Sequence, residues 1–241
     1  MYVLALGSFP LTMVRRTKAE AEATRAQILD AAERVFRERG VSRTSLQDVA
    51  AAAGVTRGAI YWHFKDKAEV FMAMMDRVCL PCELAAEAQA NPAHGSALAC
   101  LAEMALEPLR DLQQDPHLQQ VFHIAMHCTE YTDDLAAVRA RRLDAVQGYQ
   151  QMMQRVLQQA QQQGEVPADL ALAPAAAGLF ALIDGLMRNG TLAEGPFDLQ
   201  AVGPVAVRAY IDGLRTPATA ASPAAPGRSP RKSPARPAPS T

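Results

Sequence analysis

The chain has 241 residues, of which 49% are hydrophobic, and its 24 Lys and Arg nearly balance 25 Asp and Glu. This length is ample for a buried core. No segment is long and apolar enough to cross a bilayer, which excludes an integral membrane protein and favours a cytoplasmic location.

The charge is unevenly distributed along the chain. Residues 13–67 carry 11 basic and 7 acidic side chains, whereas residues 68–215 carry 9 basic and 18 acidic ones. A basic segment attracts the phosphate backbone of a nucleic acid, and an acidic segment is repelled by it. We therefore expect a DNA-binding domain over residues 13–67 and a body over residues 68–215 that stays away from the DNA.

Both ends of the chain lie outside these two segments. Residues 1–12 are mildly apolar and lack a charged leader and a cleavage site, so we interpret them as an over-extended gene start or a disordered leader. Residues 216–241 are rich in Pro, Ala and Ser and contain four basic and no acidic side chains, which predicts a disordered tail. This tail is either a solvated appendage or a source of non-specific DNA affinity.

The basic segment begins with a predicted amphipathic helix over residues 24–39. Its apolar residues recur at helical spacing, namely Ile28, Ala32, Val35 and Phe36. Gly40 follows the helix as a C-terminal breaker.

Two short helices are predicted next. Residues 46–53 form one, capped by the hydroxyl group of Thr44 or Ser45 and ended by Gly54 in a left-handed conformation. Thr56 caps the other, which is too short to be stable alone and must be held by packing of Ile60. A short helix presented in this way is typical of the reading element of a helix-turn-helix.

The side chains on the third helix fit a DNA groove. Arg57 and Tyr61 lie four residues apart on one face, and Gly58 between them allows close approach of the backbone. An arginine can bond guanine bidentately in the major groove, whereas Tyr61, His63 and Lys67 are suited to phosphates. We assign Trp62 and Phe64 to the core, and the predicted DNA-contacting residues are Thr44, Ser45, Thr56, Arg57, Gly58, Tyr61, His63 and Lys67.

At this point a family resemblance emerges. Residues 24–71, TRAQILDAAERVFRERGVSRTSLQDVAAAAGVTRGAIYWHFKDKAEVF, resemble the N-terminal domain of the TetR family of bacterial repressors. MVRRTKAEAEATR near the start and LIDGLMRNGTL near the end further resemble the AcrR-like branch, which represses multidrug efflux-pump operons. The resemblance implies a homodimer that binds a palindromic operator in double-stranded DNA and releases it when a small-molecule inducer binds the C-terminal domain.

The acidic segment is helical throughout by its periodicity. A helix is predicted from Lys67 to Leu80, where Pro81 ends or kinks it. Further helices are predicted over residues 96–113, 116–130, 135–163, 174–189 and 199–215. The fold class is therefore all-α, with an N-terminal three-helix helix-turn-helix domain and a C-terminal helical ligand-binding and dimerisation domain.

The last two helices are rich in small and apolar residues. Such faces suit either a four-helix subunit interface or internal packing. Because the last two helices of TetR-like proteins form the dimer contact, the resemblance favours an interface, with Gly178, Leu182, Leu186, Val202, Ala206 and Ala209 as its residues.

By position, several helices look like the walls of the efflux-repressor cavity. The candidate ligand-binding residues are Met104, Phe122, His123, Met126, His127, Phe180, Asp184 and Met187. A carboxylate in an otherwise apolar helix needs a partner when buried, so we expect Asp184 to orient a polar or cationic ligand.

No pattern of catalytic residues is found, so an enzyme is not expected. His123 and His127 are four residues apart but lack the glutamate of a metalloprotease, and we expect no metal and no cofactor. The alternative reading is a regulator of the same fold that senses a metabolite or an oxidant through Cys79, Cys82 or Cys128.

Overall fold

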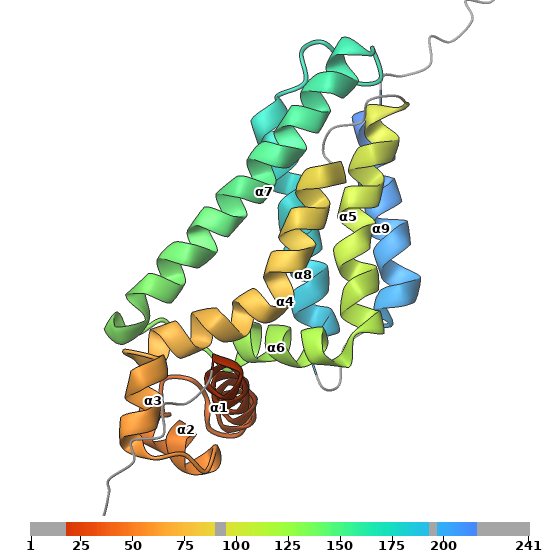
Figure 1. The fold of residues 1–241 in the computed structure, drawn as a ribbon. Coiled ribbons are helices and arrows are strands. Elements are labelled where there is room, and N and C mark those ends of the chain that lie inside the picture. Colours follow the sequence, from red (N-terminus) through yellow and green to blue (C-terminus); the bar gives the residue numbers. More distant parts are fainter. Residues whose placement is uncertain (1–17, 90–94, 193–196, 216–241) are drawn as a thin grey trace, which may run out of the picture.

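The structure is a computed structural model that describes residues 18–89, 95–192 and 197–215, with side chains described outside 79–89. The described residues contain helices and no strand, so the all-α fold class is confirmed. Helices α1 (Lys18–Arg39), α2 (Leu46–Ala52) and α3 (Arg57–His63) form a small N-terminal unit, which we call the reading head (residues 18–64), at the bottom of Figure 1. The first helix begins six residues before the predicted start.

Local signals set the boundaries of these three helices. Gly40 and Gly54 have positive φ angles of 81° and 66°, a conformation that side chains with a Cβ disfavour, so each glycine ends its helix as predicted. Ser45 caps α2 in a reciprocal capping box with Asp48, and hydrogen bonds from Ser45 lower the pKa of the Asp48 carboxyl group. Thr56 caps α3 by accepting a hydrogen bond from the backbone of Ala59 at 3.1 Å.

An apolar core holds the short third helix in place. Ile60 is fully buried, as are Phe36 and Val49 from the two preceding helices, and Phe64 is 1% exposed. Burying one such side chain contributes about 1.5–3 kcal/mol. The seven-residue α3 is therefore stabilised by tertiary packing, as predicted, because a helix of this length is not stable alone.

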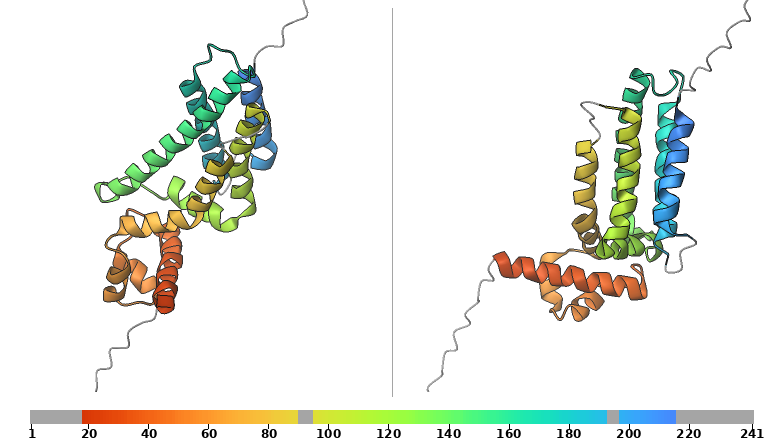
Figure 2. Two further views of the ribbon diagram at one scale, coloured as in Figure 1. Left: turned by 45° about the horizontal axis from the view of Figure 1, so that its top comes forward. Right: turned by 90° about the vertical axis from the view of Figure 1, so that its right-hand side faces the viewer.

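The rest of the chain forms the body (residues 67–214), a bundle of long helices above the reading head (Figures 1 and 2). Its elements are α4 (Lys67–Gln89), α5 (Ala97–Gln114), α6 (Pro116–His127), the short 3₁₀ helix η1 (Asp133–Leu135), α7 (Ala136–Gln162), α8 (Leu172–Gly190) and α9 (Leu199–Leu214). Helix α6 lies across the base of the bundle against α1. Helix α4 leads directly from the reading head into the bundle, so it belongs to both units.

Of the two alternatives for Pro81, a helix end or a kink, the helix end is wrong, because α4 continues to Gln89. A proline inside a helix removes one backbone hydrogen bond and costs about 3 kcal/mol. Pro108 in α5 and Pro204 in α9 also lie inside helices, so this bundle tolerates the loss repeatedly. The proposed disordered ends, residues 1–12 and 216–241, lie outside the described residues. Among the helices described, none combines the length and the hydropathy that a membrane span requires.

Candidate functional site

The outer face of α3 presents the predicted reading residues to solvent. Thr56, Arg57, Gly58 and Tyr61 are all exposed. The Arg57 guanidinium group lies 5.7 Å from the centre of the Tyr61 ring, a cation–π contact that orders the arginine without using up its hydrogen-bond donors. The exposed face of α3 therefore carries an ordered arginine whose guanidinium group is accessible to a DNA groove.

The assignment of Trp62 to the core is wrong, whereas that of Phe64 is confirmed. The Trp62 side chain is 73% exposed and its ring meets that of His63 edge to face, with centroids 4.5 Å apart. The seven residues of α3 bury only one side chain, Ile60, so no core position remains for the indole. Trp62 thus joins the exposed surface beside Tyr61.

The Lys67 side chain makes its polar contacts within the protein. Its side chain is 12% exposed, and its ammonium group donates to the backbone carbonyl of Ser42 at 3.0 Å and pairs with Asp134 Oδ2 at 3.0 Å. Together with a hydrogen bond from Thr132, this pairing lowers the pKa of the Asp134 carboxyl group. The structure therefore places Lys67 at the contact between head and body and away from the position expected for a phosphate ligand.

The two candidate capping residues have different places. Ser45 is exposed and caps α2, whereas Thr44 is 3% exposed and donates to the carbonyl of Gly40 at 2.8 Å. The hydroxyl group of Thr44 is thus turned into the head and closes the turn after α1.

Exposed basic side chains beside the predicted reading residues were missed in the sequence. Arg25 on α1 lies 5.0 Å from the centre of the Phe64 ring, next to the end of α3. Arg43 and Lys65 are exposed in the turns that follow α1 and α3. Arg25 and Phe64 are far apart in the sequence, so no spacing predicts their contact.

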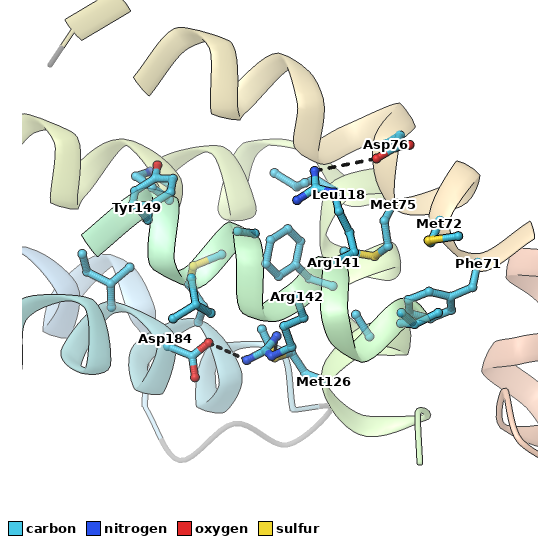
Figure 3. Close-up of a pocket in the computed structure, with 18 of the residues that line it drawn as sticks. Phe71, Met72, Met75, Asp76, Leu118, Met126, Arg141, Arg142, Tyr149 and Asp184 are labelled. Carbon is cyan, nitrogen blue, oxygen red and sulfur yellow. Dashed lines mark hydrogen bonds and ion pairs between the residues drawn. The ribbon is translucent and has the colours of Figure 1, made fainter. Parts of the chain in front are cut away.

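A cavity of about 200 Å³ lies inside the body (Figure 3). Helices α4, α5, α6, α7 and α8 contribute to its wall, which consists chiefly of aromatic, methionine and other apolar side chains. The lining residues that dominate it are Phe71, Met72, Met75, Phe122, Met126, Tyr149, Phe180 and Met187. Flexible thioethers and aromatic rings suit apolar ligands of varied shape.

Five of the eight candidate ligand residues line this cavity, and three do not. Phe122, Met126, Phe180, Asp184 and Met187 belong to the wall. Met104 is fully buried in the core of α5 and does not reach the cavity. His123 and His127 face the end of α8 instead.

These two histidines cap α8. His123 Nδ1 donates to the carbonyl of Thr191 at 2.9 Å, and His127 Nε2 lies 3.0 Å from both the carbonyl of Arg188 and the hydroxyl of Thr191. Arg188 in turn donates to the carbonyl of Met126 at 3.2 Å. The last turns of α6 and α8 therefore satisfy each other's unpaired carbonyl groups, and the i, i+4 spacing of the histidines serves this contact.

Two ion pairs cross the wall of the cavity, both from α7. Arg142 Nη2 lies 3.0 Å from Asp184 Oδ1 on α8, and Arg141 Nη2 lies 3.9 Å from Asp76 Oδ1 on α4 (Figure 3). The partner that Asp184 was expected to need is thus an arginine of the same chain. This pairing could not be predicted from local spacing because its members are 42 residues apart.

A charged cluster joins the head to the body beneath the cavity. Glu33 on α1 is 4% exposed, and it is the one acidic or basic residue fully buried among those that the structure describes. Its carboxylate lies 3.0 Å from His117 Nε2 on α6 and 3.4 Å from Arg77 on α4, and Arg77 also pairs with Asp30 at 2.8 Å. A buried carboxylate that loses such partners is costly, so the cluster ties three helices together.

The loop between α6 and η1 forms a second contact with the head. The backbone of Val41 donates to the carbonyl of Cys128 at 2.8 Å, and Ser42 donates to Glu130 at 3.3 Å. Burial raises the pKa of the Cys128 thiol, and burial likewise raises that of Cys100, so neither thiol is activated as a thiolate. The side chains of Cys79 and Cys82 lie outside the described ones.

The outer face of α8 and α9 differs in part from the predicted interface. Leu186 is 7% exposed and packs inside the subunit, and Gly178 makes room for the ring of Tyr210 within the same chain. Leu182, Val202 and Ala206 are half-buried, and Ala209 is exposed. Solvent reaches Ala181 and, at 67%, Val205, so small apolar residues remain on the outside of both helices.

Comparison with protein families gives two matches. Residues 28–74 match the bacterial regulatory proteins of the tetR family, and residues 96–216 match the C-terminal region of MAATS-type transcriptional repressors. The first match covers most of the reading head and the start of α4. The second covers the cavity-bearing part of the body and both helices of the outer face.

Individual proteins give the same picture. The chain is 41% identical over 187 residues to the HTH-type transcriptional regulator TtgR of Pseudomonas putida, an alignment that covers 78% of this chain and 89% of TtgR. It is similar in structure to NalD, the secondary repressor of the MexAB-OprM multidrug efflux pump in Pseudomonas aeruginosa, with a TM-score of 0.75, 32% identity and coverage of 83% of this chain and all of NalD. It also resembles SmeT, the repressor of the Stenotrophomonas maltophilia efflux pump SmeDEF, in complex with triclosan, with a TM-score of 0.72, 28% identity and coverage of 87% and 100%.

Proposed function

Because the chain belongs to the TetR family of bacterial transcriptional regulators, we propose that it represses a multidrug efflux-pump operon and leaves its operator when a small molecule fills the cavity. The observation that carries this proposal is the position of α4. This helix starts three residues after Phe64 at the end of the reading head and supplies Phe71, Met72, Met75 and Asp76 to the cavity wall.

The DNA side of the function rests on the exposed face of α3. Arg57 reads a base edge in the major groove, and Tyr61 with the neighbouring basic side chains holds phosphates. Two heads bind successive major grooves about 34–36 Å apart, so the operator is palindromic double-stranded DNA. We propose that the protein acts in the cytoplasm, where its operator is found.

The second head comes from a second copy of the chain. The exposed small residues of α8 and α9, with Ala181 and Val205 at the centre, form the subunit interface, and Leu182, Val202, Ala206 and Ala209 complete it. Small residues allow close helix approach, which favours a four-helix contact between two subunits.

The ligand acts on the head through two contacts beneath the cavity. Arg77 follows Asp76 of the cavity wall, and His117 precedes Leu118 of the same wall. Both side chains hold the buried carboxylate of Glu33 on α1. A ligand that moves α4 relative to α6 shifts the position of α1 and therefore changes the spacing of the two heads. Such a ligand lowers operator affinity if it binds more tightly to the conformation with the changed spacing.

The relatives indicate which genes and ligands to test first. NalD and SmeT repress efflux pumps, and SmeT is known in complex with triclosan. We propose an efflux operon next to the gene as the target and hydrophobic compounds of this kind as inducers. A coupling of about 1.4 kcal/mol suffices to lower operator affinity tenfold.

Selection from a random DNA library tests the proposal directly. The full-length protein is expected to enrich an inverted repeat, and footprinting of the DNA upstream of the neighbouring genes is expected to protect a matching site. Enrichment of no sequence, with affinity that depends only on salt, would refute the assignment as an operator-binding repressor.

A further inference from the structure

The Arg142–Asp184 pair lies in the wall of the ligand cavity. Arg142 Nη2 lies 3.0 Å from Asp184 Oδ1, and Arg142 Nη1 contacts the sulfur of Met126 at 3.6 Å. The side chains of Arg142 and Asp184 are 31% and 26% exposed, and both line the cavity together with Met126 (Figure 3). Each of these two charges therefore already has a partner of opposite sign.

The other ionisable groups of the wall are also engaged. Arg141 pairs with Asp76 at 3.9 Å, a longer contact between more exposed side chains that solvent screens more strongly. Asp111 of the same wall also makes an interaction within the protein. Both arginines of the wall therefore have an acidic partner, and a charged ligand would compete with these two pairs.

The rest of the cavity wall makes it unfavourable for a charged ligand to replace Arg142 or Asp184 in their ion pair. Phe122, Phe180 and Met187 belong to the same cavity wall as the pair, and an unpaired charge in a largely apolar wall is costly. A cationic ligand that takes Asp184 leaves the guanidinium group of Arg142 without its carboxylate. An anionic ligand that takes Arg142 does the same to Asp184, whereas an uncharged aromatic ligand leaves the pair intact.

We propose that the Arg142–Asp184 pair makes the cavity selective for uncharged aromatic ligands that carry at most a hydroxyl group, and that it discriminates against ligands that are cationic or anionic at neutral pH. The inference rests on the proposed function only in taking this cavity as the ligand site. It gives Asp184 a role opposite to cation capture: the carboxylate neutralises Arg142, and the pair as a unit sets the specificity.

Three ligands of one shape test the proposal by titration calorimetry at pH 7. They are biphenyl-4-ylmethanol (uncharged), biphenyl-4-ylmethylamine (cationic) and biphenyl-4-carboxylate (anionic). The wild-type protein is expected to bind the alcohol about tenfold more tightly than either charged probe, which corresponds to breaking one ion pair on the wall.

Variants of the pair are expected to change this order in opposite directions. Arg142→Gln leaves Asp184 free and is expected to raise the affinity for the amine about tenfold, while Asp184→Asn raises that for the carboxylate similarly. Affinity for the alcohol should change less than about threefold. Arg139→Gln and Asp144→Asn on α7 remove the same charges from exposed positions outside this cavity, and are expected to leave the order unchanged.

Several results would overturn the proposal. They are equal affinity of the wild type for the amine and the alcohol, an unchanged order in both variants of the pair, or no binding of any probe at millimolar concentration. The double variant Arg142→Gln/Asp184→Asn has no unpaired charge and decides the question if a single variant does not fold. It is expected to retain its affinity for the alcohol and to bind both charged probes with the same affinity as the alcohol. Operator affinity is measured in a separate experiment. A protein that binds no operator would contradict the proposed function but would leave the order of affinities for the three probes unchanged.

Discussion

The reading helix α3 exposes its arginine to solvent, whereas the body pairs the charged side chains of the two arginines that reach its cavity. Arg57 is exposed and ordered only by a ring, so its donors remain available to a base or a phosphate. Arg142 is held by a carboxylate at 3.0 Å. An exposed arginine can offer its donors to a ligand, whereas an arginine held by a carboxylate cannot do so without breaking its ion pair.

At the contact between the two regions, charged side chains are largely buried and bridge the head and the body. Glu33 and Lys67 are charged, yet their side chains are only 6% and 12% exposed, and each bridges head and body. The partners of Glu33 lie on α4 and α6, which both line the cavity, and Lys67 pairs with Asp134 in η1. The head is therefore fixed to two of the helices that form the cavity wall.

The largest expected effect concerns the subunit interface of the body. Val205→Glu or Ala181→Glu places a charge in an apolar interface and should yield monomers, detected by light scattering. A single head makes half the phosphate contacts, so operator affinity should fall about 100-fold or more. Leu143→Glu on α7, at a position 55% exposed, is the matched control and should remain dimeric. Variants of α8 and α9 that stay dimeric would place the interface elsewhere.

A smaller effect is expected within the head. Arg57→Ala should cost about 1–3 kcal/mol of operator binding and relax the preference at one base pair, because a bidentate base contact is lost. Tyr61→Phe should weaken all sequences alike, since it removes a phosphate contact. Affinities for the operator and for a set of single-base variants, measured by fluorescence anisotropy, separate the two. An unaltered base preference in Arg57→Ala would contradict the assignment of α3 as the reading helix.

The contact between head and body should give a coupled effect of about 1 kcal/mol. Asp134→Asn should weaken operator binding because it breaks the pair with Lys67. Lys67→Met should weaken it at least as much because it also removes the hydrogen bond to the Ser42 carbonyl, and the double variant should be no worse than Lys67→Met. The slope of affinity against salt should stay constant. A lysine that held a phosphate would behave otherwise: Lys67→Met alone would lower affinity and the salt slope, and Asp134→Asn would not reproduce it.

The smallest expected effect is the pH dependence of the cap on α8. Burial lowers the pKa of His127, and the nearby His123 and Arg188 add to this, although the hydrogen bond to the Arg188 carbonyl opposes it. The unfolded chain therefore binds a proton more readily, so stability should fall as pH drops below about 6.5. His127→Gln can still donate to that carbonyl and should show a weaker decrease in melting temperature between pH 7.5 and pH 5.5. An equal decrease in both proteins would show that other groups dominate.

The sequence predicted the head better than the body. Gly40, Gly54, Ser45 and Thr56 act on their own neighbours, so their effect on helix ends could be read from local order. The exposure of Trp62 could not, because it depends on how the seven residues of α3 lie on the core.

In the body, periodicity predicted the helices but not their partners. Asp184 was expected to need a partner, yet the partner, Arg142, lies 42 residues away and only the packing of α7 on α8 brings it near. Met104, His123 and His127 have the residue types of a ligand site and face elsewhere, which helical spacing alone does not distinguish. The path of α4 through Pro81 likewise depends on the bundle and not on local preference.

The measurement that tests the account most directly is operator affinity with and without a ligand in the cavity. A labelled operator fragment is titrated with the full-length protein at fixed salt, in the absence of ligand and with saturating biphenyl-4-ylmethanol. The account predicts at least a tenfold loss of affinity, about 1.4 kcal/mol, and the same factor in the affinity of the ligand for free and operator-bound protein. Saturation of the cavity with operator affinity unchanged would contradict the claim that this cavity controls the reading head.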